Sequence, residues 1–151
     1  MKWVVGVIAF LIILGFVGVG RFCANQKKQE ERLIVNLIID ANDRFCALCS
    51  YQDEDAKYKV SFLELCIEDD CDFALEMMKR IEDFPPGTEI PNWQFVQIIE
   101  DNGIDKWVEI LEKGQGGEKY FNALIQPYGS SFKFSRIEFG DGFTKVAGKG
   151  W

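Results

Sequence analysis

The sequence predicts an α+β protein in which an N-terminal transmembrane helix continues into an amphipathic stalk helix, followed by a small helical region and a C-terminal antiparallel β-meander. Three observations support this prediction. Residues 3–20 carry no charged side chain. Apolar residues in 23–50 recur at intervals of three and four, which is typical of one helical face. In the last third of the chain, apolar and polar residues alternate between glycine-containing turns, as strands do.

Residues 1–22 are expected to be a transmembrane anchor. From Trp3 to Gly20 every residue is apolar or glycine, and Lys2 and Arg21 stand at the two ends. A helix rises about 1.5 Å per residue, so this stretch covers roughly 27 Å, close to the hydrocarbon thickness of about 30 Å. The apolar core of a cleaved signal peptide has only about 7–15 residues. We therefore expect an uncleaved signal anchor and a single-pass membrane protein.

Two signals disagree about the side of the membrane on which the soluble part lies. Basic residues follow the apolar stretch while only Lys2 precedes it, which places the C-terminal part in the cytoplasm. The very short N-terminal tail is instead typical of an export signal, and the cysteine pattern favours an oxidising compartment. We expect the soluble domain on the extracytoplasmic side. The basic residues are Arg21, Lys27, Lys28 and Arg32.

Residues 23–50 are expected to form the amphipathic stalk helix. Its apolar face is wide, which favours packing against the chain's own domain over the narrow seam of a coiled coil. This face consists of Leu33, Ile34, Leu37, Ile38, Ala41, Phe45 and Leu48.

Residues 51–151 are expected to form one small α+β domain that is helical over 57–113 and β-rich over 119–147. The clearest break is Pro85-Pro86-Gly87. Apolar spacing predicts four helices, over residues 57–67, 69–83, 91–102 and 105–113. In the first of these, Tyr58, Val60 and Phe62 also alternate as in a strand, and we expect the helix. Alternation predicts three strands and a bulge at Arg136. The expected strands are 121–125, 132–139 and 143–146.

Composition narrows the classes of partner and of chemistry. The net charge of −7 argues against a nucleic-acid surface, which would need a basic stripe. The chain has no histidine, so it lacks the commonest general base and the commonest metal ligand. Thirteen phenylalanines and four tryptophans supply a core and an aromatic contact surface. The expected partners are the lipid bilayer and another membrane protein or complex.

Four cysteines, Cys46, Cys49, Cys66 and Cys71, are the only group of residues in the sequence that suggests a chemical role. The fifth, Cys23, lies apart from them at the membrane boundary. Two nested disulfides, Cys49 with Cys66 and Cys46 with Cys71, would staple the stalk helix to the next helix. The spacing of the same four residues is also near that of a zinc site. Cys46 and Cys49 alone could be a redox pair, although a position near a helix C-terminus does not favour a thiolate. Inert buried thiols are the fourth interpretation.

The sequence therefore predicts a membrane-anchored accessory or assembly subunit that acts through protein–protein contact and is not an enzyme. No catalytic residue and no cofactor site are assigned. One alternative is a membrane-tethered thiol oxidoreductase that uses Cys46 and Cys49. Another is a cytoplasmic adaptor stabilised by zinc.

Overall fold

The structure, a computed structural model, describes the backbone of residues 2–51 and 56–140, and within them the side chains of residue 21 and of residues from 23 onwards. The expected anchor, residues 1–22, thus has its side chains outside the described residues, except that of Arg21. Within the part that is described, no helix has both the length and the apolar character needed to cross a membrane.

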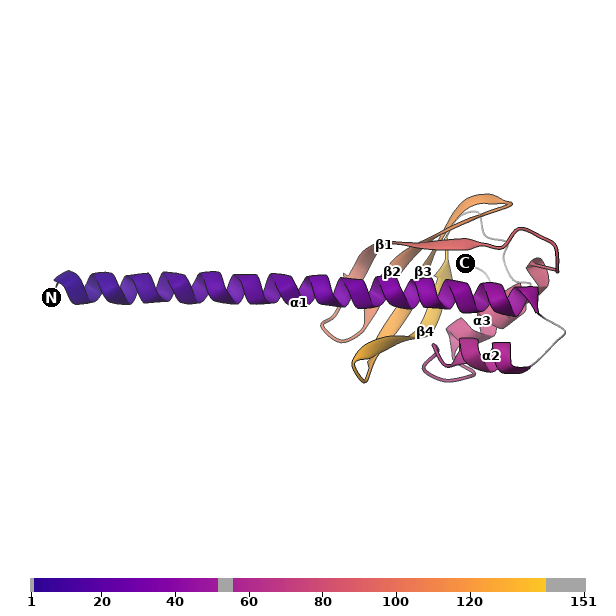
Figure 1. Ribbon diagram of the computed structural model, residues 1–151, viewed down its shortest axis with the longest axis horizontal. Coiled ribbons are helices and arrows are strands. Elements are labelled where there is room, and N and C mark those ends of the chain that lie inside the picture. The colour runs from indigo at the N-terminus through magenta and orange to yellow at the C-terminus, as the bar shows by residue number, and fades with distance from the viewer. Residues whose placement is uncertain (1, 52–55, 141–151) are drawn as a thin grey trace. The chain divides into compact units, whose positions relative to one another are not determined.

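The described residues form three α-helices and one four-stranded antiparallel sheet, so the chain is α+β as expected (Figure 1). The strands follow one another in the order β1-β2-β3-β4. The chain divides into two units, Met1–Leu33 and Ile34–Trp151, with the division inside the first helix. The elements are α1 (Lys2–Ser50), α2 (Ala56–Leu63), α3 (Asp72–Arg80), the 3-10 helix η1 (Ile81–Asp83), β1 (Asn92–Asp101), β2 (Lys106–Gly114), β3 (Gly117–Tyr128) and β4 (Ser131–Phe139).

The C-terminal part of α1 supplies one side of the core. Six of the seven residues on its expected apolar face are buried, which confirms that this part of the helix packs on its own domain. Phe45 is fully buried and lies at the centre of an aromatic cluster, with ring centroids 5.1 Å from Trp93 and 5.8 Å from Phe62. Asn42, one turn before, donates to the carbonyl of Pro91 and accepts from the backbone N–H of Trp93. The helix is thereby hydrogen-bonded to the start of β1.

The short helices agree in type with the prediction, but their ends differ. α2 ends at Leu63, four residues before the expected end. The next residues leave the helix because they pair with the edge of β4: the Ile67 N–H donates to the Phe134 carbonyl, and the Phe134 N–H donates to the Leu65 carbonyl. α3 then packs beside β4, with Phe73 stacked on Phe134 at 4.2 Å.

The helix expected over residues 91–102 is wrong, because this segment is strand β1. Its pairing with β2 shifts register between Phe95 and Gln97 and again between Ile98 and Glu100. Each shift inserts one extra residue into β1. The β1 residues that pair with the inward-facing side chains of β2 are therefore first two apart in the sequence and then three apart. Such spacing resembles that of a helix face, whereas the aromatic and β-branched composition is typical of a strand.

The helix expected over residues 105–113 is also wrong, because this segment is strand β2. Its buried positions alternate regularly, but two of the four inward residues are charged, Lys106 and Glu112. A charged residue at an inward position hides the alternation of apolar side chains on which a strand prediction depends. The domain is therefore β-rich from residue 92, and the expected helical range 57–113 contains the first half of the sheet.

The two remaining strands confirm the predicted meander and lengthen it. β3 and β4 contain the expected segments 121–125 and 132–139. Leu124 pairs with Arg136 and Ile125 with Phe134, so the bulge lies at Ser135, next to the expected position. The third expected strand, 143–146, lies outside the described residues.

Candidate functional site

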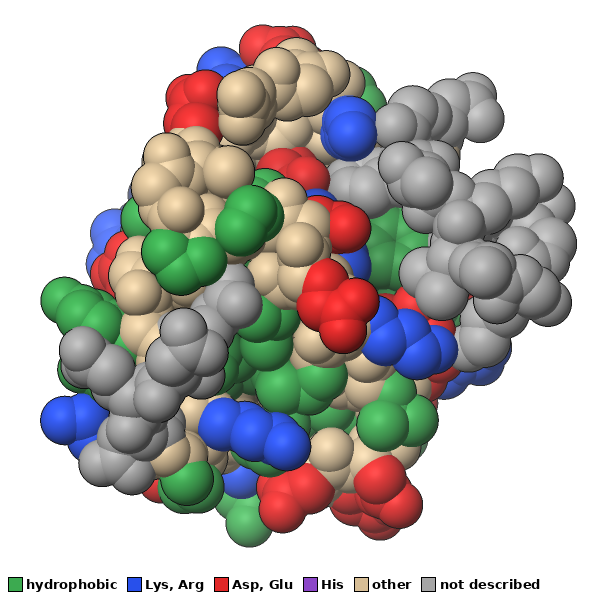
Figure 2. Space-filling view, turned by 90° about the vertical axis from the view of Figure 1, so that its right-hand side faces the viewer, with side chains coloured by type: hydrophobic (Ala, Val, Ile, Leu, Met, Phe, Trp, Pro, Cys, Tyr) green, Lys and Arg blue, Asp and Glu red, His purple; other side chains and the backbone are tan. Residues whose placement is uncertain are grey.

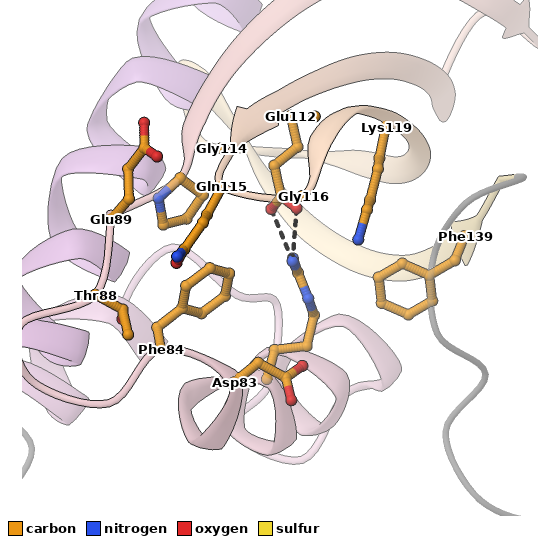
Figure 3. Close-up of a pocket in the computed structure, with 13 residues that line it drawn as sticks. Asp83, Phe84, Thr88, Glu89, Glu112, Gly114, Gln115, Gly116, Lys119 and Phe139 are labelled. Carbon is orange, nitrogen blue, oxygen red and sulfur yellow. Dashed lines mark hydrogen bonds and ion pairs between the residues drawn. The ribbon is translucent and has the colours of Figure 1, made fainter.

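A pocket of about 450 Å³ lies where the end of α3, the loop before β1 and the turn between β2 and β3 meet (Figure 3). Its lining combines glycines of the β2–β3 turn, two phenylalanine rings and side chains of both charges. The lining residues are Arg80, Asp83, Phe84, Thr88, Glu89, Pro91, Glu112, Gly114, Gln115, Gly116, Gly117, Lys119 and Phe139.

A buried ion pair lies in the wall of this pocket. Nη2 of Arg80 donates to both carboxylate oxygens of Glu112, each at 2.8 Å (Figure 3). Nε1 of Trp93 donates to one of the same oxygens, also at 2.8 Å. The Arg80 guanidinium carbon is 5.5 Å from the centroid of the Phe84 ring and 5.7 Å from that of Phe139. Both charges are thus held by hydrogen bonds and aromatic faces, as a buried pair requires.

This arrangement is better suited to structure than to catalysis. The Glu112 carboxylate accepts three charge-assisted or indole hydrogen bonds, so its oxygens are directed at fixed donors. Lys119 adds a second cation, which points into the same pocket in Figure 3. With no histidine in the sequence, the pocket has none of the usual proton carriers near neutral pH. The lining of this pocket offers polar contacts, and it includes no cysteine.

This ion pair was not predicted from the sequence. Arg80 and Glu112 are 32 residues apart, and no local spacing connects them. A usable signal was present in the strands, because Trp93 and Glu112 are direct partners in the β1–β2 register. Recognising both segments as strands would have placed the indole beside an inward carboxylate.

Cys46 and Cys49 lie on the last turns of α1, and their thiols stay protonated near neutral pH. Cys46 accepts a hydrogen bond from Nδ2 of Asn42 at 3.1 Å, and its own thiol donates to the Pro91 carbonyl at 3.4 Å. Burial, and then the charge of Asp43, raise the pKa of Cys46 to about 11. Burial, and then Cys46, raise the pKa of Cys49 to about 12. These values do not favour the redox pair considered from the sequence, since the thiolate is the nucleophile.

Cys66 and Cys71 lie together at the other end of the helical region. Their side chains interact with each other, and the Cys71 thiol faces the carbonyl of Phe134, with a sulfur–oxygen distance of 3.6 Å. Cys71 is the N-cap residue of α3. The hydrogen bond from Cys66, followed by nearby backbone N–H groups including that of Ala74, lowers the pKa of Cys71 to about 6. The same contact and burial raise the pKa of Cys66.

The structure therefore groups the cysteines differently from the sequence interpretation. All five cysteines are free thiols in the structure, and the expected disulfides between Cys49 and Cys66 and between Cys46 and Cys71 stay predictions. The four zinc candidates separate into two pairs, and within the described residues no three histidine, cysteine, aspartate or glutamate side chains gather as a metal site. Cys23 is exposed.

Comparisons with protein-family models, with curated proteins and with solved structures found no match to this chain.

Proposed function

We propose that this chain is a single-pass membrane-anchored accessory or assembly subunit that acts through contact with another protein, with its domain on the extracytoplasmic side. The anchor is residues 3–20, whose uncharged length of roughly 27 Å suits a bilayer. α1 includes this stretch and continues without a break to Ser50. The backbone hydrogen bonds of the apolar stretch are therefore made within the helix, as a lipid environment demands.

The exposed apolar side chains of strand β1 and the turn after it are the observation that supports a contact function best. Val96 is 41% exposed, Ile99 49% and Ile104 66%. Large apolar side chains gathered on one segment are a common feature of protein contact sites, whereas single ones are ordinary. We call these three residues the β1 contact segment.

The position of β1 in the sheet makes this segment accessible. The far edge of β4 is covered by residues 65–67, whereas β1 pairs with β2 alone among the described strands. The two register shifts in β1 interrupt the regular row of backbone groups along this edge. Bulges of this kind disfavour the addition of a further strand. The partner therefore binds through apolar side-chain contacts and not by extending the sheet.

The charge distribution favours a protein partner over a nucleic acid. The net charge is −7, and on the face in Figure 2 acidic and basic side chains are interspersed among apolar ones. Such a mixed surface is unlike the basic stripe that binds phosphates. The bound partner is expected to present an apolar surface of its own.

The anchor is tested by fractionating cells that produce the full chain and washing the membranes with alkaline carbonate. The full chain should stay in the membrane pellet, whereas a Leu11→Arg/Leu14→Arg variant should be released, because each charge at a membrane centre costs about 2.5–3.5 kcal/mol on the insertion scale. Release of the full chain under the same wash would contradict the anchor. A tag placed after Trp151 should be digested by protease added to intact cells, and protection of the tag would contradict the proposed side.

The contact segment is tested by photo-crosslinking in intact membranes. A photoreactive residue at Ile99 should give a discrete protein adduct, and one at Glu138, exposed on β4 at the other edge, serves as the matched control. The adduct from position 99 should be lost when Val96→Glu and Ile104→Glu are introduced, since a charge cannot be buried against an apolar partner. Equal adducts at both positions, or an adduct unaffected by the charges, would contradict the proposed surface.

A further inference from the structure

The cysteine pair at the start of α3, Cys66 and Cys71, differs from the other cysteines. The pKa of the Cys71 thiol is lowered, and the Cys66 thiol interacts with it. Cys66 is 3% exposed and Cys71 is partly exposed, so only Cys71 is open to a reagent from solution. Cys66 is bridged to Phe134, and the Cys71 sulfur lies 3.6 Å from the carbonyl oxygen of the same residue, so the two side chains interact across a loop of four intervening residues. This is the spatial relation that an attacking thiol and a resolving thiol require.

The fold holds each of the two residues from an independent side. Cys66 forms a β-bridge with Phe134, because the backbone groups of Leu65 and Ile67 are hydrogen-bonded to that residue at 2.9 and 2.8 Å. Cys71 is held as the N-cap of α3, where its carbonyl accepts from the Leu75 N–H at 3.0 Å and its own N–H donates to the Glu68 carbonyl at 3.2 Å. The positions of the two cysteines are thus set by a strand and a helix.

The surroundings favour a thiolate at Cys71. The N-terminus of a helix has a partial positive charge, and backbone N–H groups near the sulfur stabilise a negative charge there. The carboxylate of Asp72, the next residue, accepts from the backbone N–H of Ile137 at 3.1 Å and is hydrogen-bonded towards β4. The charged groups that face the pair are Asp69, which disfavours ionisation of Cys66, and Lys133 of β4, which favours it. The pKa of Cys71 is lowered to about 6.

We propose that Cys66 and Cys71 are a reversible dithiol–disulfide pair that exchanges with small disulfides, with Cys71 as the attacking residue and Cys66 as the resolving residue. The Cys71 thiolate attacks one sulfur of a small disulfide, forming a mixed disulfide and releasing one small thiolate. Cys66 then gives its proton to solvent and attacks the Cys71 sulfur, forming the Cys66–Cys71 bond and releasing the second small thiolate. Two protein thiols are oxidised and one small disulfide is reduced to two thiols. This proposal does not depend on the contact function.

The test uses the full chain in detergent, reduced and freed of reductant, and then incubated with oxidised glutathione at pH 7. Peptide mapping should find a bond between Cys66 and Cys71. In a Cys66→Ser variant, exchange should stop at a single glutathione on Cys71. A Cys46→Ser/Cys49→Ser variant should form the same bond as the original chain. Formation of a bond between residues 46 and 49 only, or glutathione on Cys23 alone, would overturn the proposal.

A second measurement on the unsubstituted chain does not depend on whether the variants fold. The rate at which iodoacetamide modifies each cysteine is followed from pH 8 to pH 6 by mass spectrometry. The rate for Cys71 should fall only about 2-fold, since about half of a thiol with a pKa near 6 is still ionised at pH 6. An ordinary thiol with a pKa near 8.5 should slow by roughly 75-fold, and the exposed Cys23 is the internal reference. Parallel profiles for the two residues would overturn the assignment of Cys71 as the attacking thiol.

Discussion

The buried ion pair between Arg80 and Glu112 is expected to behave as a unit, so that replacing one partner destabilises the domain far more than replacing both. Both side chains are less than one-tenth exposed. Glu112→Leu leaves the buried guanidinium of Arg80 without the Glu112 carboxylate. Arg80→Met removes two of the three hydrogen bonds that the Glu112 carboxylate accepts, so that only the one from the Trp93 indole N–H remains. Removing one partner of a buried pair costs about 3–5 kcal/mol.

The double variant Arg80→Met/Glu112→Leu removes both charges and leaves the Trp93 N–H without its acceptor. An unsatisfied buried donor costs about 1–3 kcal/mol, while an apolar replacement of a buried pair is often neutral or stabilising. The double variant should therefore lose about 1–3 kcal/mol, although the two single losses sum to about 6–10 kcal/mol. The difference predicts a coupling energy of at least about 3 kcal/mol, at the upper end for residues in one network.

The assay is urea unfolding of the full chain in detergent, followed by tryptophan fluorescence. Trp93 is a suitable reporter, because it is buried and stacked on Phe45. The matched control is the pair Lys113–Glu118, which is exposed and has a nitrogen–oxygen distance of 3.7 Å. The same kinds of substitution there should change the free energy of unfolding by less than about 1 kcal/mol. Additive losses at Arg80 and Glu112, or single losses as small as those of the control, would refute the reasoning.

Three further predictions use the same unfolding assay. Phe45→Ala should lower the free energy of unfolding by about 3–5 kcal/mol, because a fully buried ring leaves a cavity. Gly140→Ala should cost about 1–3 kcal/mol, because its Cβ would lie 2.7 Å from a backbone carbonyl oxygen; Gly114→Ala, with its nearest neighbour at 3.9 Å, should cost less and is the control. Burial raises the pKa of Cys46 to about 11 and that of Cys49 to about 12, so the folded state keeps protons that the unfolded state loses from pH 9 upwards. Stability should therefore fall as the pH rises from 9 to 11, and a Cys46→Ala/Cys49→Ala variant should show a shallower fall; equal slopes would contradict the raised values.

The elements that could be predicted correctly are those whose pattern is local and undisturbed. The apolar face predicted over residues 33–48 has a regular helical period, and the structure buries all of it except Leu33. The strands 121–125 and 132–139 alternate clearly, and the bulge that interrupts the second was found within one residue. Pro85-Pro86-Gly87 was predicted as a break, and the chain there does connect two elements, η1 and β1, although a helix was expected after it instead of a strand.

The first half of the sheet could not be predicted, because its local pattern is misleading. The register shifts in β1 change the spacing of inward residues from two to three, which is the spacing expected of a helix. In β2 the inward Glu112 looks like a solvent-facing residue unless Arg80 is known to lie opposite it. The first misleading feature is made by pairing with the next strand, and the second by a partner 32 residues away.

The amino-acid sequence alone determined the α+β class, the buried face of the long helix, the late meander and the apolar character of residues 3–20. Each of these follows from side chains that are neighbours in the chain. Only the tertiary structure decided that Arg80 pairs with Glu112 and that Cys66 and Cys71 both lie against Phe134 of β4. These pairings depend on the sheet register and on the bridge from residue 66 to β4. The physical reason is that spacing along the chain fixes which side chains share one element's face, whereas contacts between elements are fixed by packing and hydrogen bonding across the whole domain.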